Sequence, residues 1–200
     1  MVKHEIKGTA YPLESIAVSD LDGDGAEEII LPIHQWGILL VIRYPGSEGK
    51  TEIENLWLTT RLGPVKFITA ADINGDGKVD LLAPPESPSA SDDGATKLKI
   101  LINEGELKFN LHELDFPVRE KNGMPGIRAI DTAIDHDGLR YIIAAGYENY
   151  VIYQIPGNHD LTSVAWREIL YPRKEGNSKV VMRDIDGDGW LDFVVARGRD

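Results

Sequence analysis

Three nine-residue runs carry oxygen-bearing side chains at their first, third, fifth and ninth positions. The runs begin at Asp20, Asp72 and Asp184, and each has glycine at positions four and six. Ca²⁺ takes six to eight oxygen ligands, and alternate residues of a tight loop can point their side chains around one ion. Each run therefore predicts a calcium loop in which the seventh residue adds only a backbone carbonyl. We call the runs that begin at Asp20, Asp72 and Asp184 loops one, two and four, because a degraded copy described below lies between the last two. The predicted ligands are Asp20, Asp22, Asp24, Ala26 and Glu28 in loop one, Asp72, Asn74, Asp76, Lys78 and Asp80 in loop two, and Asp184, Asp186, Asp188, Trp190 and Asp192 in loop four.

The glycines and the flanking residues distinguish these loops from other motifs. Glycine at position six permits a sharp bend, and glycine at position four lets the backbone close in. An EF-hand needs a bidentate Glu at position twelve between two helices. Position twelve here is Leu31, Ala83 or Val195, inside short apolar runs that are typical of strands. A solvated Asp-Gly turn explains one such run as well as calcium does, but three copies in one strand context favour calcium.

A fourth copy of the motif lies between loops two and four in degraded form. It runs from Ala133 to Tyr141 and keeps Asp135, Asp137 and Gly138 at positions three, five and six. The side chains at positions one and nine can no longer ligate as carboxylates. We call this run loop three and expect no tight calcium there, so the sequence predicts three bound ions.

Short apolar runs on both sides of each loop set the expected fold. No segment has a convincing helical period, and each repeat reads as four strands. The expected strands cover about 14–19, 27–33, 37–44 and 54–61, then 65–71, 80–84, 97–103 and 107–115, then 127–133, 141–146, 150–155 and 164–170. Repeats of roughly 40–60 residues with four strands each are typical of a β-propeller.

The sequence thus predicts an all-β chain forming one β-propeller of four-stranded antiparallel blades, with about three and a half blades present. The expected blades cover residues 13–62, 65–116 and 126–171, with a partial blade at 178–200 and a lone outer strand at 3–8. An open arc would expose apolar sheet faces and edges. The chain is therefore expected to be part of a longer one, although a four-bladed ring closed by the first strand is an alternative.

Composition excludes several classes of function. The net charge is −12, much of it concentrated in the calcium loops, and no basic stripe suggests nucleic-acid binding. The absence of cysteine excludes disulfides, thiolate metal sites and a cysteine nucleophile. No apolar run is long enough for a membrane span. The first residues lack the apolar stretch of a signal peptide, which indicates either a cytosolic protein or a leader outside this sequence.

The whole second repeat resembles the FG-GAP or VCBS repeat. The resemblance rests on Ala71–Leu81, on the run Ile100–Gly105 and on Phe109. It implies a calcium-binding propeller in an extracellular or periplasmic setting, acting as a carbohydrate- or protein-binding module. The same resemblance also covers propeller portions of secreted carbohydrate-active enzymes, of the polysaccharide lyase or sugar dehydratase type, and purely structural scaffolds. Glu28 in place of the usual final Asp and the degraded loop three depart from the pattern.

The face opposite the calcium loops is the expected ligand surface. Aromatic, amide and cationic side chains in the loops there suit sugars, particularly acidic ones. The candidates are His34, Gln35, Trp36, Arg61, Tyr147 and Asn149. The alternative is that the aromatic residues cover blade edges and the cations are merely solvated. No catalytic set is visible in the sequence, which favours a binding module over an enzyme.

Overall fold

The protein is described by a computed structural model. It describes residues 15–33, 38–43, 54–59, 62, 65, 67–84, 97–117, 127, 129–146, 149–170 and 177–197. Apart from one 3₁₀ turn, η2 (Leu161–Ser163), the regular elements in these ranges are β-strands. Within the same ranges, no helix has the length and apolar character that a membrane crossing needs. The expected strand at residues 3–8 lies outside the described residues.

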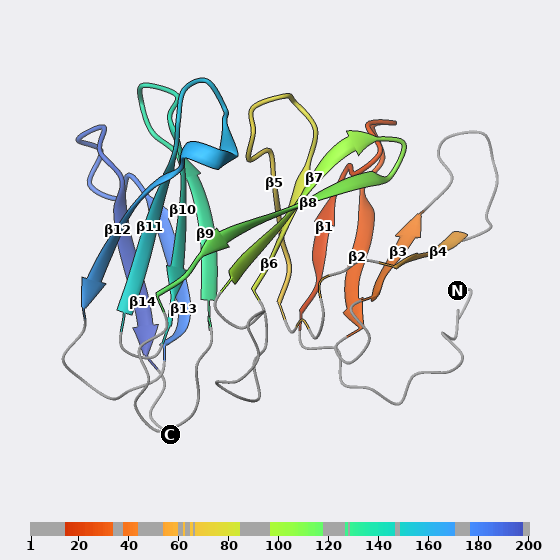
Figure 1. Ribbon diagram of the computed structural model, residues 1–200, viewed down its shortest axis with the longest axis horizontal. Coiled ribbons are helices and arrows are strands. Elements are labelled where there is room, and N and C mark those ends of the chain that lie inside the picture. Colours follow the sequence, from red (N-terminus) through yellow and green to blue (C-terminus); the bar gives the residue numbers. More distant parts are fainter. Residues whose placement is uncertain are drawn as a thin grey trace.

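Consecutive strands form separate antiparallel sheets (Figure 1). Sheet 1 contains β1 (Ala17–Ser19), β2 (Glu28–Ile33), β3 (Ile38–Arg43) and β4 (Glu54–Thr59). Sheet 2 contains β5 (Thr69–Ala71), β6 (Asp80–Ala83), β7 (Lys97–Gly105) and β8 (Lys108–Asp115). Sheet 3 contains β9 (Ala129–Ile134), β10 (Arg140–Ala145), β11 (Asn149–Ile155) and β12 (Ala165–Leu170). Sheet 4 contains β13 (Asn177–Arg183) and β14 (Asp192–Arg197).

The all-β class and the four-stranded antiparallel sheets confirm the prediction from sequence. In sheets 1 to 3 each strand pairs with the next one along the chain, in the order expected for one repeat per sheet. The second strands β6 and β10 are buried over most of their length, which is the reason for their nearly continuous apolar runs. The fourth strand β12 is mostly exposed and forms the outer edge of sheet 3.

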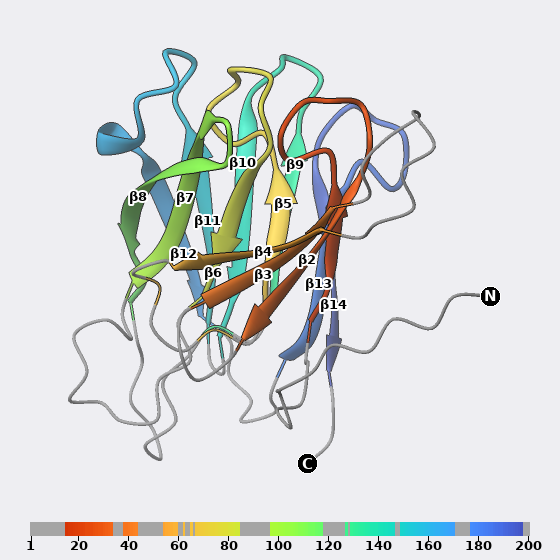
Figure 2. The ribbon, with the colours of Figure 1, turned by 90° about the vertical axis from the view of Figure 1, so that its right-hand side faces the viewer.

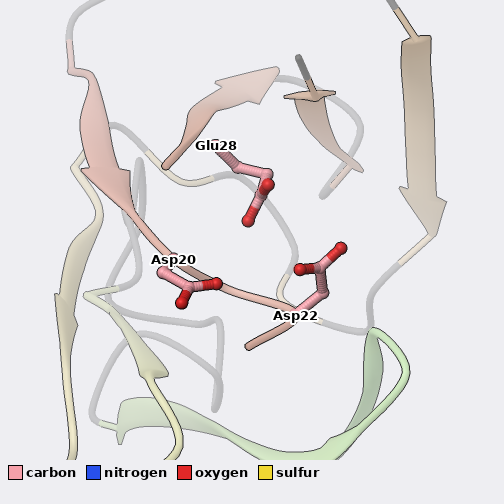
Figure 3. Close-up of side chains that lie close together, drawn as sticks. All are labelled: Asp20, Asp22 and Glu28. Carbon is pink, nitrogen blue, oxygen red and sulfur yellow. The ribbon is translucent and has the colours of Figure 1, made fainter. Parts of the chain in front are cut away.

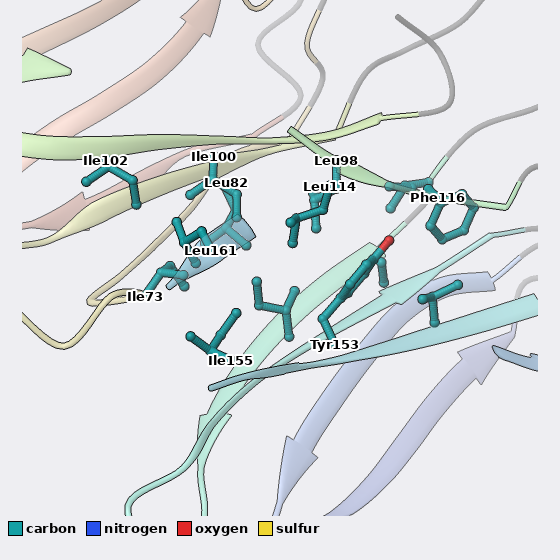
Figure 4. Close-up of a cluster of buried hydrophobic side chains, with 14 residues drawn as sticks. Ile73, Leu82, Leu98, Ile100, Ile102, Leu114, Phe116, Tyr153, Ile155 and Leu161 are labelled. Carbon is teal, nitrogen blue, oxygen red and sulfur yellow. The ribbon is translucent and has the colours of Figure 1, made fainter. Parts of the chain in front are cut away.

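Apolar side chains fill the space between neighbouring sheets. Leu82 and Ile100 of sheet 2 belong to one buried cluster with Tyr153 and Ile155 of sheet 3 (Figure 4). A second cluster joins sheets 1 and 2, and a third joins sheets 3 and 4. The core is therefore divided into layers between stacked sheets, so that each repeat contributes to the burial of its neighbour.

The loops that connect the first and second strand of each sheet lie along one edge of the molecule. They occupy the upper edge in Figure 1 and again in Figure 2. Neighbouring sheets also meet through their first strands, β1 with β5, β5 with β9 and β9 with β13. The stacking therefore brings loops one to four next to one another in chain order, which makes contacts between successive loops possible.

Candidate metal centres

Loops one, two and four fold by the same hydrogen-bond scheme, which starts at position one. The carboxylate of Asp20 accepts hydrogen bonds from the backbone N–H groups of Gly23 at 2.8 Å and Gly25 at 3.0 Å. Asp72 and Asp184 accept from the matching glycines of their own loops at 2.6 to 3.2 Å. The first aspartate thus organises the turn as well as offering oxygen atoms.

The remaining polar positions repeat in the same way. The side chain at position three accepts from the N–H of residue five at 3.0 to 3.1 Å, and that at position five accepts from residue seven at 2.8 Å. The carboxylate at position nine accepts from residue two at 2.7 to 3.2 Å. This scheme explains why acidic or amide side chains recur at alternate positions.

The glycines have a role that differs in part from the one expected. All six at positions four and six have φ between 77° and 92°, a conformation that only glycine adopts without strain. A side chain at Gly23 or Gly187 would meet nothing within 4 Å, so crowding does not select glycine there. Only at Gly75 does a close approach matter, because an added Cβ would lie 2.6 Å from His159 and 2.9 Å from Arg140.

Two of the loops gather three carboxylates around a common space. Ligand oxygens of Asp20, Asp22 and Glu28 lie within 4.8 Å of one another, and the three side chains converge in Figure 3. Asp184, Asp186 and Asp192 form the equivalent group in loop four. The position-five aspartates of these two loops lie outside the groups. Closely spaced carboxylate oxygens are the donor set that Ca²⁺ prefers.

Glu28 is the most constrained acid of loop one. It is fully buried, and its Oε2 accepts a hydrogen bond from the N–H of Leu21 at 2.7 Å. Its Oε1 is buried and has no hydrogen-bond partner among the described residues. Burial, and then repulsion from Asp24 and Asp20, raises the pKa of Glu28 despite the opposing hydrogen bond from Leu21. On the other side of the loop, the guanidinium of Arg43 contacts Asp22.

Loop two has a different electrostatic environment. Burial raises the pKa of Asp80, although its carboxylate accepts hydrogen bonds from three backbone N–H groups, including that of Asn103. Lys78 Nζ lies 3.1 Å from Asp76, and Arg140 Nη2 lies 3.3 Å from Asp72. Hydrogen bonds from Lys78 and Asn74 outweigh partial burial and lower the pKa of Asp76. Two of the three carboxylates in this loop are therefore already beside cations.

Loop three closes on itself without the missing carboxylates. Asp135 Oδ1 accepts from the N–H groups of Asp137 at 3.0 Å and Leu139 at 2.8 Å. Burial and a hydrogen bond to Asp135 raise the pKa of Tyr141, which stands where the other loops have their final acid. The nearby Asp131 accepts from the N–H of Met182 and pairs with Arg183, so it ties sheet 3 to sheet 4.

Polar side chains link successive loops. The buried Asn103 donates to the carbonyl of Leu21 in loop one at 2.7 Å and to that of Val79 in loop two at 3.0 Å. His136 Nδ1 lies 2.7 Å from the carbonyl of Gly189, and its ring meets Trp190 edge-on at 5.0 Å. His136 is exposed, and it also bridges loops three and four. Nothing in the motif points to Asn103, which lies on β7.

Five of the six candidate ligand residues lie outside the described residues: His34, Gln35, Trp36, Arg61 and Tyr147. Asn149 is described and is 2% exposed. Its amide nitrogen donates to the carbonyl of Pro117 at 2.8 Å and to Glu168 at 2.9 Å. Asn149 is therefore a buried residue that links β11 to β12 and to the segment after β8.

Comparison with known families matches the two halves of the chain to one family model. The model for the FG-GAP-like repeat covers residues 20–83 and again 134–195, which together are more than half of the chain. The chain belongs to the FG-GAP-like repeat family. The resemblance seen in the sequence is thereby confirmed. The first match of this FG-GAP-like chain spans loops one and two, and the second spans loop four and all of loop three except its first residue. Comparison with curated proteins gave no match.

Proposed function

We propose that this FG-GAP-like chain is a calcium-stabilised binding module. The observation that carries the proposal is the buried Oε1 of Glu28, which lacks a partner among the described residues and belongs to the same group as Asp20 and Asp22. A buried carboxylate oxygen without a partner is costly. A cation that prefers oxygen ligands, bound next to Oε1, would offset that cost. Ca²⁺ accepts the mixture of carboxylate and carbonyl oxygens that such a loop offers.

The proposed ligands are those expected from the motif. In loop one they are Asp20, Asp22, Asp24, Glu28 and the carbonyl of Ala26. Loop four offers the same set through Asp184, Asp186, Asp188, Asp192 and the carbonyl of Trp190, with three of its carboxylates already close together. Loop two offers Asp72, Asn74, Asp76, Asp80 and the carbonyl of Lys78. It fits less well, because Lys78 and Arg140 contact two of its carboxylates.

The proposed architecture is a β-propeller in which sheets 1 to 3 are blades and sheet 4 is part of another. Three four-stranded sheets stacked through their faces, with first strands adjacent, support it. The proposed setting is extracellular or periplasmic, where calcium is abundant enough for sites of modest affinity. The proposed partner is a carbohydrate or an extracellular protein, bound on the face opposite the calcium loops.

Calorimetry and thermal melting test the calcium proposal. Titration of the chelator-treated chain with Ca²⁺ should show saturable binding, and chelator should lower the melting temperature. Each ion that binds only the folded state adds about 2.7 kcal/mol at 100 times its dissociation constant. Mg²⁺ should substitute poorly, because it demands a tighter octahedral shell. Absence of Ca²⁺ binding together with an unchanged melting temperature in chelator would refute the proposal.

A further inference from the structure

Arg140 contacts loop two although it belongs to the next repeat. It is the eighth residue of loop three and the first residue of β10. Its Nε donates to the backbone carbonyl of Asp72 at 3.1 Å, and its Nη2 donates to Oδ2 of the same residue at 3.3 Å. The two side chains are 20% and 27% exposed, so water screens this pair less than it screens a fully exposed one.

The neighbouring structure leaves room for this contact. A Cβ atom on Gly75 would lie 2.9 Å from Nη1 of Arg140, so the glycine of loop two permits the guanidinium to approach. The corresponding glycines of loops one and four meet nothing within 4 Å. Loop two is therefore the loop against which side chains of the following repeat, Arg140 and His159, pack at this position.

The three intact loops differ in how many of their carboxylates already contact a cation. In loop two, Arg140 contacts Asp72 and Lys78 contacts Asp76. In loop one, Arg43 contacts Asp22. In loop four, the described residues show no ion pair to its four aspartates, and the adjacent Arg183 turns to Asp131 instead. Loop two also has one acid fewer, because Asn74 is neutral.

We propose that Arg140 is a built-in counter-ion of loop two, supplied by the repeat whose own calcium loop has degenerated. Its positive charge offsets the repulsion among the carboxylates of loop two, so this loop keeps its conformation without a metal ion. The same charge repels an incoming divalent cation and competes for an oxygen of Asp72. Loop two is then the last of the three intact loops to bind calcium, a consequence that rests on the proposed function.

The test compares Arg140→Gln with Arg167→Gln. Arg167 lies exposed on β12 of the same sheet, so the control removes an equal charge away from the loops. In chelator, Arg140→Gln should melt below both the wild type and Arg167→Gln. In calcium titrations its weakest site should tighten by on the order of tenfold, because charges a few ångströms apart near a surface interact by several times thermal energy. Added calcium should then restore most of the lost melting temperature.

Other outcomes separate the possible errors. Equal destabilisation of Arg140→Gln with and without calcium would overturn the proposal, because a simple inter-sheet salt bridge behaves in that way. An unchanged melting temperature in chelator would overturn it as well. If the wild type binds no calcium, the proposed function fails, while the melting comparison in chelator still tests the counter-ion. Lys78→Gln, a milder change at a half-exposed residue, should also tighten the weakest site, and Arg140→Lys should leave it weak.

Discussion

Replacing Glu28 by Gln should change the stability of the metal-free and the calcium-bound protein in opposite directions. Glu28 is fully buried, burial raises its pKa, and one of its oxygens has no hydrogen-bond partner among the described residues. Glutamine has nearly the same shape, can still accept from the N–H of Leu21, and brings an amide that can donate to the nearby carboxylates of Asp20 or Asp22. It also removes the charge on which calcium binding would depend.

The size of both effects follows from the surroundings of the side chain. A buried polar group without a partner costs about 1–3 kcal/mol, so the metal-free variant should gain about 1–2 kcal/mol. For a chain of this length that corresponds to a rise in melting temperature of roughly 2–8 °C. With calcium at 100 times the dissociation constant, the wild type should gain about 2.7 kcal/mol from loop one that the variant lacks. The order of the two melting temperatures should therefore reverse between chelator and calcium.

Differential scanning fluorimetry of both proteins in chelator and in saturating calcium measures this reversal. Glu113→Gln is the matched control, because Glu113 is exposed on β8, outside the loops. It should shift the melting temperature little and equally in both conditions. If Glu28→Gln melts below the wild type in chelator, the buried carboxylate does not destabilise the metal-free protein and the reasoning is wrong. If it melts above the wild type in saturating calcium, loop one does not depend on Glu28 for its ion.

Two further predictions concern the link between loops and the dependence on pH. Asn103→Ala removes the donors to the carbonyls of Leu21 and Val79, and should lower the free energy of unfolding by about 2–3 kcal/mol with or without calcium. Urea denaturation of this variant and of the exposed control Asn110→Ala measures the loss. A loss of stability seen only in chelator would contradict the prediction. The pKa of Glu28 is raised in the folded state, so the folded protein binds a proton on this carboxylate more tightly than the unfolded chain does. The ionised carboxylate therefore destabilises the fold at neutral pH. This destabilisation is lost as the pH falls toward 4.5, the ordinary pKa of the group. The advantage of Glu28→Gln in chelator should shrink over the same range, and a constant difference in melting temperature would argue against a titrating Glu28.

The strands around each loop could be predicted because the information is local. Short apolar runs flank each glycine-rich loop, and in loop one they become β1 and β2, paired in register from Ser19 with Glu28 to Ala17 with Ile30. Asn149 shows where local reading fails. The sequence predicts that Asn149 lies in a loop of the ligand surface, whereas it begins β11, and its amide donates to Pro117 and Glu168. Residue type alone does not say which way a polar side chain at a strand end points.

The electrostatic differences between the loops could not be predicted from the motif, because most of them arise outside it. The hydrogen-bond scheme within loops one, two and four is the same, and among the three contacting cations only Lys78 lies inside the loop that it contacts. Arg43 lies on β3, and Arg140 is 68 residues away from Asp72. Arg43 reaches loop one because β3 pairs with β2 of the same sheet, whereas Arg140 reaches loop two because sheets 2 and 3 are stacked. The calcium affinities that we propose for these three loops should therefore differ, in an order set by the neighbours that the fold places beside each loop.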